Sequence, residues 1–135
     1  MFLKLLNNEQ KKLFLSLAYD LAIADGCFSK DEVEVMNSYA DEMKVEFVLE
    51  DVEKDLVRVI DKMNDVCSHQ EKKIVIFEII GLAMADSKYD EAERKIVNHA
   101  MTVFNLDMEY GTYCEDKISQ YLVLQEELSK RILSE

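Results

Sequence analysis

One short passage of this chain occurs twice, without a gap in the alignment of the two copies. The first copy runs from Leu21 to Glu32 and the second from Leu82 to Glu93. Each copy has an apolar stretch, an Asp, a small turn residue, an aromatic residue, a helix-capping residue, and a Glu seven places after the Asp. Such a duplication predicts two related helical halves that pack as one body, with the acidic turn as the feature to explain.

The composition favours helices. The chain has 135 residues, no proline and only three glycines, and 49% of its residues are apolar. Long uninterrupted helices joined by short turns are typical of such a composition, and a chain of this length forms one domain with its own core. We therefore expect an all-α fold of about six helices in a single bundle. Residues 1–135 would form one domain, with pseudo-repeats at about 9–64 and 68–133.

Apolar spacing and capping patterns predict where the helices lie. The expected spans are 9–25, 30–44, about 48–64, 68–82, 90–104 and 108–133. The fourth is apolar on nearly every side, so we expect it at the centre of the bundle.

Several residues should begin or end these helices. Asn8 is the expected N-cap of the first helix, and Gly26 suits the left-handed position that follows the end of that helix. Capping boxes, in which two residues bond each other's backbone N–H groups, are expected at Ser29 with Glu32, Ser68 with Glu71, and Asp90 with Glu93.

The net charge of -12 limits the kinds of molecule that the chain is expected to bind. It opposes binding to phosphate backbones, and no apolar stretch reaches the roughly 18 residues of a membrane-spanning helix. We therefore expect neither nucleic-acid binding nor membrane insertion. The three cysteines are widely spaced without a C-x-x-C pair, which indicates a reducing, cytoplasmic location. The surplus carboxylates are left to bind cations, contact basic proteins or keep the chain soluble.

The acidic turns place charge where it is unfavourable. Asp25 and Asp86 each lie four residues after a buried-stripe leucine, at the expected C-terminal end of a helix. The helix dipole there disfavours a negative charge by a few tenths to about 1 kcal/mol. Because both copies keep an Asp at this unfavourable position, we expect each carboxylate to have a partner that offsets the cost.

Two kinds of partner are compatible with the residues. In the first, each Asp accepts backbone N–H groups of its turn, while Glu32 and Glu93 act in capping boxes. In the second, Asp and Glu face one another across the corner and bind a cation, with helix-end carbonyls as further ligands. All-oxygen ligation would favour Mg²⁺, Ca²⁺ or Mn²⁺ over zinc.

A calcium loop of the EF-hand type is excluded. Asp25, Gly26, Phe28 and Glu32 match loop positions 5, 6, 8 and 12, but positions 1 and 3 would be occupied by apolar side chains that cannot ligate.

The repeated A-D-G-x-aromatic-S-x-x-E turn resembles that of the TerB-like tellurite-resistance family, which is also similar to the N-terminal region of a membrane-anchored DnaJ-type co-chaperone. The resemblance covers roughly residues 9–107. It implies a bacterial, duplicated all-helical protein linked to stress responses and to divalent-metal binding. The implied metal-binding positions are Asp25, Glu32, Asp86 and Glu93.

The second copy departs from the family pattern at two positions. Ser87 replaces the turn glycine, and Arg94 follows Glu93 where Val33 follows Glu32.

Nothing in the sequence indicates an enzyme. It has no G-x-S-x-G motif and no phosphate-binding glycine loop, and His69 and His99 have no partner at metal-ligand spacing. We therefore weigh two functions. One is a non-enzymatic, stress-associated cytosolic module that binds a divalent cation at the acidic turns. The alternative is an acidic adaptor for a basic protein partner, with the turn residues as structural caps.

Overall fold

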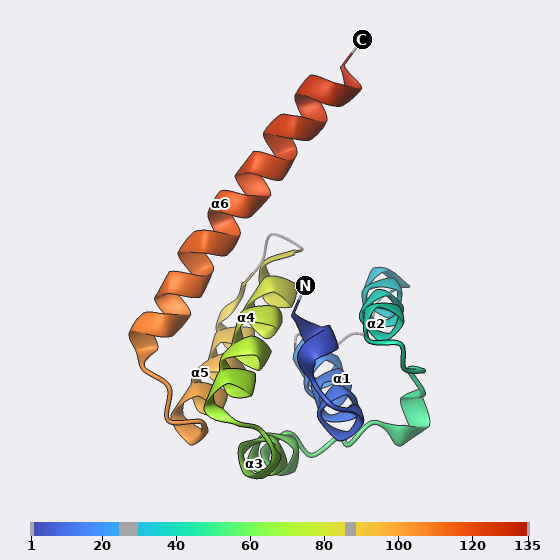
Figure 1. Ribbon diagram of the computed structural model, residues 1–135, viewed down its shortest axis with the longest axis vertical. Helices are drawn as coiled ribbons and strands as arrows, with labels where there is room; N and C mark the ends of the chain where they lie inside the picture. Colours follow the sequence, from blue (N-terminus) through green and yellow to red (C-terminus); the bar gives the residue numbers. More distant parts are fainter. Residues whose placement is uncertain (1, 25–29, 86–88, 135) are drawn as a thin grey trace.

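The computed structural model describes residues 2–24, 30–85 and 89–134, and for residues 30–33 and 35 it describes the backbone alone. Within these ranges the chain forms six α-helices and two 3-10 turns, with no strand, which confirms the predicted all-α fold (Figure 1). The elements are η1 (Leu3–Leu5), α1 (Asn8–Ala22), α2 (Lys30–Met43), η2 (Leu49–Asp51), α3 (Leu56–Val66), α4 (His69–Ala85), α5 (Glu91–Val103) and α6 (Met108–Leu133).

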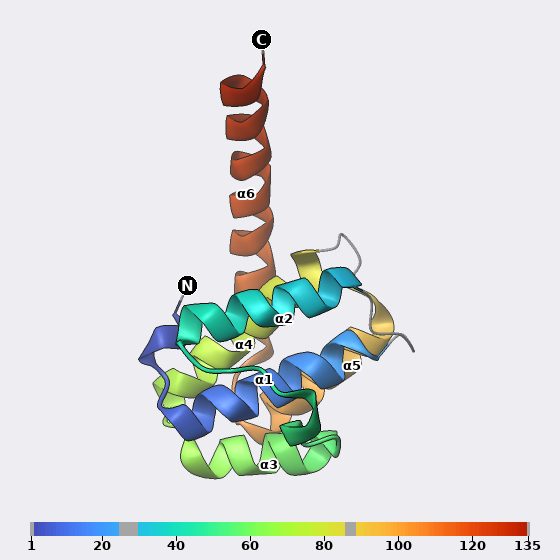
Figure 2. The ribbon, with the colours of Figure 1, turned by 90° about the vertical axis from the view of Figure 1, so that its right-hand side faces the viewer.

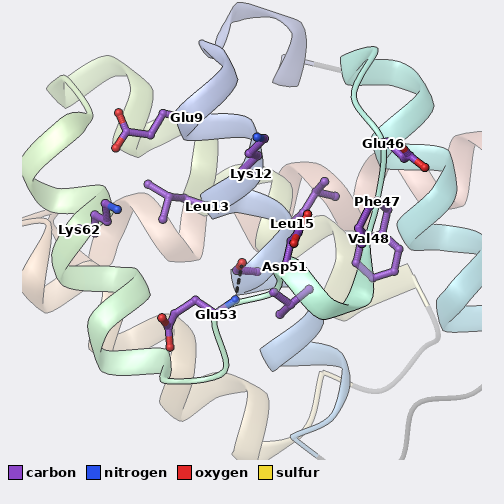
Figure 3. Close-up of a pocket in the computed structure, with 12 residues that line it drawn as sticks. Glu9, Lys12, Leu13, Leu15, Glu46, Phe47, Val48, Asp51, Glu53 and Lys62 are labelled. Carbon is purple, nitrogen blue, oxygen red and sulfur yellow. Dashed lines mark hydrogen bonds between the residues drawn. The ribbon is translucent and has the colours of Figure 1, made fainter.

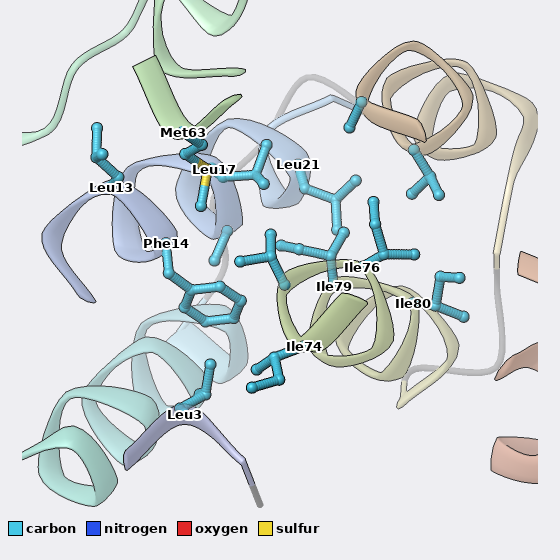
Figure 4. Packing of buried hydrophobic residues seen from close by; sticks show 14 of the residues in the cluster. Leu3, Leu13, Phe14, Leu17, Leu21, Met63, Ile74, Ile76, Ile79 and Ile80 are labelled. Atoms are coloured by element: carbon cyan, nitrogen blue, oxygen red, sulfur yellow. The ribbon is translucent and has the colours of Figure 1, made fainter. Parts of the chain in front are cut away.

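Helix α4 lies between the two sides of the bundle. It packs against α1 on one side and against α5 and α6 on the other, while α1 also contacts α2 and α3. Figure 4 shows Leu17 and Leu21 of α1 on the side of that helix that faces Ile79 of α4, and all three are at most 1% exposed. Because α4 is apolar on most sides, it is stable only when helices cover it all round.

The starts of α1 and α4 are equivalent. Asn7 and Ser68 are separated by the same offset as the two copies of the repeat, and each accepts a hydrogen bond from the backbone N–H three residues later. The side chains of Gln10 and Glu71 in turn accept from the cap residues' N–H groups, at 2.9 and 2.8 Å. The predicted Ser68 box is confirmed. The first helix is capped by Asn7, and the predicted cap Asn8 is its first helical residue, because the reciprocal pair forms with Gln10.

The ends of α2 and α5 repeat in the same way. Lys44 and Asn105, again separated by the repeat offset, adopt φ angles of 57° and 56°. The next residues, Val45 and Leu106, donate their N–H groups to carbonyls five residues back, at 3.0 and 2.9 Å. This is the Schellman ending of a helix. The offset of the sequence repeat is therefore also the offset of these helix boundaries.

Three predicted helices begin or end elsewhere, and one of them is α4, which continues to Ala85 beyond the predicted residue 82. Helix α1 ends at Ala22, before the predicted residue 25, and Gly26 and the predicted Ser29 cap lie outside the described residues. The first residues of the helix predicted at about 48–64 form η2 and an extended stretch instead, and α3 begins at Leu56. Helix α3 starts late because Asp55 caps it by accepting from the N–H of Arg58 at 3.3 Å.

Helix α6 starts against the bundle and then leaves it. Gly111, Cys114 and Ile118 are buried, and Gly111 allows a close approach, since a Cβ there would lie 2.9 Å from the sulfur of Met101. Leu122, one turn after Ile118, still packs against the core, and beyond it the helix projects away from the other helices (Figures 1 and 2). None of the described helices is long and apolar enough to cross a membrane.

The cap of α5 gives a first prediction. Replacing Asp90 with Ala removes the acceptor for the Glu93 N–H and should lower the free energy of unfolding by about 0.5 to 2 kcal/mol without changing the fold. Urea denaturation measures the loss. Asp61→Ala, which removes an exposed carboxylate inside α3, is the control, and an equal loss in both variants would contradict a specific capping effect.

Candidate functional site

Of the four predicted carboxylates, the structure describes the side chain of Glu93 alone. Asp25 and Asp86 lie outside the described residues, and Glu32 lies in α2 at a position whose side chain is not described. Glu93 lies in the first turn of α5 and is 9% exposed. Whether the four converge on a cation therefore stays a prediction.

Glu93 forms the capping box that its spacing predicts. Its N–H donates to Oδ1 of Asp90 at 2.8 Å, and its Oε1 accepts from the Asp90 N–H at 3.2 Å. These bonds satisfy two backbone donors that the helix itself leaves unpaired. The capping role that the sequence predicts for Glu93 is thus confirmed.

Arg94, where the second copy departs from the first, ties its turn to α6. Its guanidinium lies 4.1 Å from the ring centre of Tyr89 and pairs with Glu115 at 2.9 Å. A cation over an aromatic face and a charge pair both hold the arginine in place. The arginine thus links the chain just after the acidic turn to the base of the projecting helix.

A second candidate site, which sequence reasoning missed, is a groove between α1, the segment 46–53 and α3. It encloses a cavity of about 240 Å³ (Figure 3). Five apolar side chains line it, together with four carboxylates, two lysines and a serine. They are Leu13, Leu15, Phe47, Val48 and Val52; Glu9, Glu46, Asp51 and Glu53; Lys12 and Lys62; and Ser16.

One side-chain contact fixes the far wall of this groove. The N–H of Glu53 donates to Oγ of Ser16 at 3.1 Å, which ties the extended stretch to α1 (Figure 3). Ser16 is buried, so the bond is shielded from water. Segment 46–53 therefore runs across α1 and closes one side of the groove.

The rim carboxylates differ in how they are engaged. Glu53 accepts from the Asp55 N–H at 3.0 Å and has Arg58 at 3.8 Å, an exposed ion pair of little energetic weight. Within the described ranges, the side chains of Glu46 and Asp51 form no hydrogen bond or ion pair, and both are exposed. Two negative charges on the rim are thus available to an incoming cation.

Close to the groove, Asp20 is a buried carboxyl group. It is 7% exposed, and no described residue bonds its Oδ2. Burial, together with the negative charges of Glu53 and Asp55, raises its pKa from 3.8 to about 6. The sequence contained a signal for this burial, because Asp20 follows Ser16 by four residues and therefore lies on the same side of α1.

Comparison with family models, curated proteins and solved structures finds no match to this chain.

Asp20 gives a prediction about pH. Its folded-state pKa lies above the unfolded value, so the stability that the neutral carboxyl contributes is full below pH 3.8 and is lost as the pH rises from there through about 6. At neutral pH the buried charge should lower the free energy of unfolding by about 1 to 3 kcal/mol. Asp20→Asn should therefore stabilise the protein strongly at pH 7.5 and much less at about pH 4, close to the unfolded pKa, as measured by urea denaturation.

The control for this test is Asp61→Asn, because Asp61 is an exposed carboxylate on α3. It should shift stability by at most a few tenths of a kcal/mol at either pH. A stability gain for Asp20→Asn that is the same at both pH values would contradict a raised pKa.

Proposed function

We propose that this chain is a non-enzymatic, cytosolic protein-binding module whose groove holds a basic segment of a partner protein. The observation that supports this proposal is a groove that combines an apolar strip of five side chains with two exposed, unengaged carboxylates, Glu46 and Asp51, on its rim. The proposal keeps the adaptor interpretation of the sequence and gives it a location.

The chemistry of the groove suits a lysine or arginine side chain. Such side chains cover apolar surface with their stems while the charged head stays at the edge. Here the stem would lie along Leu13 and Phe47, and the head would reach Glu46 or Asp51. The cavity of about 240 Å³ is smaller than the roughly 300 to 1,000 Å³ typical of small-molecule sites. It fits one inserted side chain of a longer segment better than a cofactor.

Charge favours the same class of partner. A net charge of -12 speeds the approach of a basic surface and weakens contact with acidic ones. Steering of this kind falls as salt is added, because the Debye length shortens to about 8 Å at physiological ionic strength. Binding should therefore weaken with salt but keep a residual apolar component.

The test uses a fluorescein-labelled peptide of alternating arginine and leucine, followed by anisotropy. Glu46→Lys with Asp51→Lys should weaken binding at least tenfold, because both rim charges reverse. Phe47→Ala should weaken it several-fold by removing part of the apolar lining.

The matched control carries the same change in charge away from the groove. Glu34→Lys with Asp116→Lys alters exposed positions on α2 and α6. A weaker effect of this control is expected. Equal losses in the two double variants would mean that only net charge matters and would reject the groove.

A cation at the acidic turns is the second candidate. Its support is the repeat itself, because the starts of α2 and α5 are separated by the repeat offset, so that the two Asp-to-Glu turns precede equivalent helices. The resemblance to TerB-like proteins supports the same stress-associated, metal-binding role. Mg²⁺, Ca²⁺ and Mn²⁺ are the ions to test.

If the turns bind a cation, millimolar Mg²⁺, Ca²⁺ or Mn²⁺ should raise the melting temperature more than a sodium salt of equal ionic strength. Asp25→Asn should remove most of that increment, whereas Asp61→Asn should keep it. A sodium salt that stabilises equally would reject the site, as would an unchanged response of Asp25→Asn.

A further inference from the structure

The outer part of α6 presents apolar side chains to solvent. We call residues 119–133 the distal arm. Tyr121, Leu124, Leu128 and Ile132 in this arm are each at least half exposed, with Ile132 at 71%. The arm projects from the bundle as a single helix in both views (Figures 1 and 2). A helix of about 15 residues that stands alone in water is only marginally stable.

These four residues lie on one side of the helix. Their spacings of three, four and four residues follow the helical repeat. The same side, continued toward the bundle, carries Ile118, which is buried there. The apolar face that anchors α6 to the bundle thus extends into the arm: Leu122, in its first turn, still packs against the core, whereas Leu124, Leu128 and Ile132 are at least half exposed.

Away from this face, α6 carries polar side chains that bond one another. Gln120 donates to Asp116 at 2.9 Å, and Lys130 pairs with Glu126 at 3.2 Å, each four residues apart. Such pairs support a solvated helix face. Four of the six exposed large apolar side chains of the arm lie on the apolar face, and Val123 and Leu133 lie outside it.

Charge along α6 has a direction. The base of α6, the part that lies against the bundle at residues 108–118, carries Glu109, Glu115, Asp116 and Lys117, a net charge of -2, and the tip carries Lys130 and Arg131, a net charge of +2. Within the arm, two carboxylates and two cationic side chains cancel, whereas the whole chain carries -12. A second copy therefore meets less repulsion at the arm than the charge of the whole chain would produce.

We propose that the distal arms of two copies pair antiparallel through this apolar face to form a symmetric dimer. In this arrangement the basic tip of each arm meets the acidic base of the other, and the helix dipoles oppose. A parallel pair would instead join like charges at both ends. It would also hold two acidic bodies side by side, where repulsion acts within a Debye length of about 8 Å.

Antiparallel pairing separates the bodies. An arm of 15 helical residues is about 22 Å long, at 1.5 Å per residue, so the two bundles lie at opposite ends of the paired arms. The groove of each bundle is built from α1, segment 46–53 and α3, so it takes no part in this contact. The dimer is therefore independent of the proposed function and adds two groove sites to one particle.

Light scattering coupled to size-exclusion chromatography tests the dimer. The full chain at about 100 μM should show twice the 15.7 kDa mass of one chain. Leu128→Glu with Ile132→Glu places charge on the apolar face and should restore the monomer mass. Both residues are exposed, so circular dichroism should show the fold retained.

The matched control adds the same two charges to the other side of the arm. Ser119 and Val123 are exposed and lie away from the apolar face, so Ser119→Glu with Val123→Glu should stay dimeric. Small-angle scattering should show an elongated particle with a bundle at each end. A monomeric parent chain, a control as disruptive as the test variant, or a compact side-by-side dimer would overturn the proposal.

Discussion

The packing of α1 against α4 is the contact on which the rest of the structure depends. Each half of the repeat buries its apolar face only when the other half covers it, and Phe14, Leu17 and Ile79 lie in that shared interior. Helix α4 is apolar on most sides, so α1 covers one side of it and α5 and α6 cover the other. The groove depends on the same contact. Residues of α1 line the groove, and α1 is held in position by its packing against α4.

The groove also depends on a short break in helical structure. Lys44 ends α2 in a left-handed conformation, and the chain then crosses α1 through η2 before Asp55 starts α3. A continuous helix would have turned the rim carboxylates elsewhere. The buried Asp20 lies near the same crossing, and its raised pKa indicates that the fold tolerates a destabilising charge there.

Local features of the fold could be predicted from the sequence, whereas the groove could not. The Ser68 and Asp90 caps each involve residues three apart, so the bonding partner is fixed by helical geometry alone. The start of α6 at Met108 agrees with the start predicted from apolar spacing. By contrast, Ser16 and Glu53 are far apart in the sequence, and no periodicity announces their hydrogen bond.

The sequence by itself determined the helical class, the duplication and the approximate helix boundaries, because backbone propensity, capping and apolar period act over a few residues. It also supplied the apolar side of the last helix. Only the tertiary structure decided which part of that side is covered: Ile118 is buried, whereas Leu128 is left in solvent. The two aliphatic positions are indistinguishable by pattern. Their burial depends on how far α4 and α5 extend alongside α6, which is a property of the packed bundle.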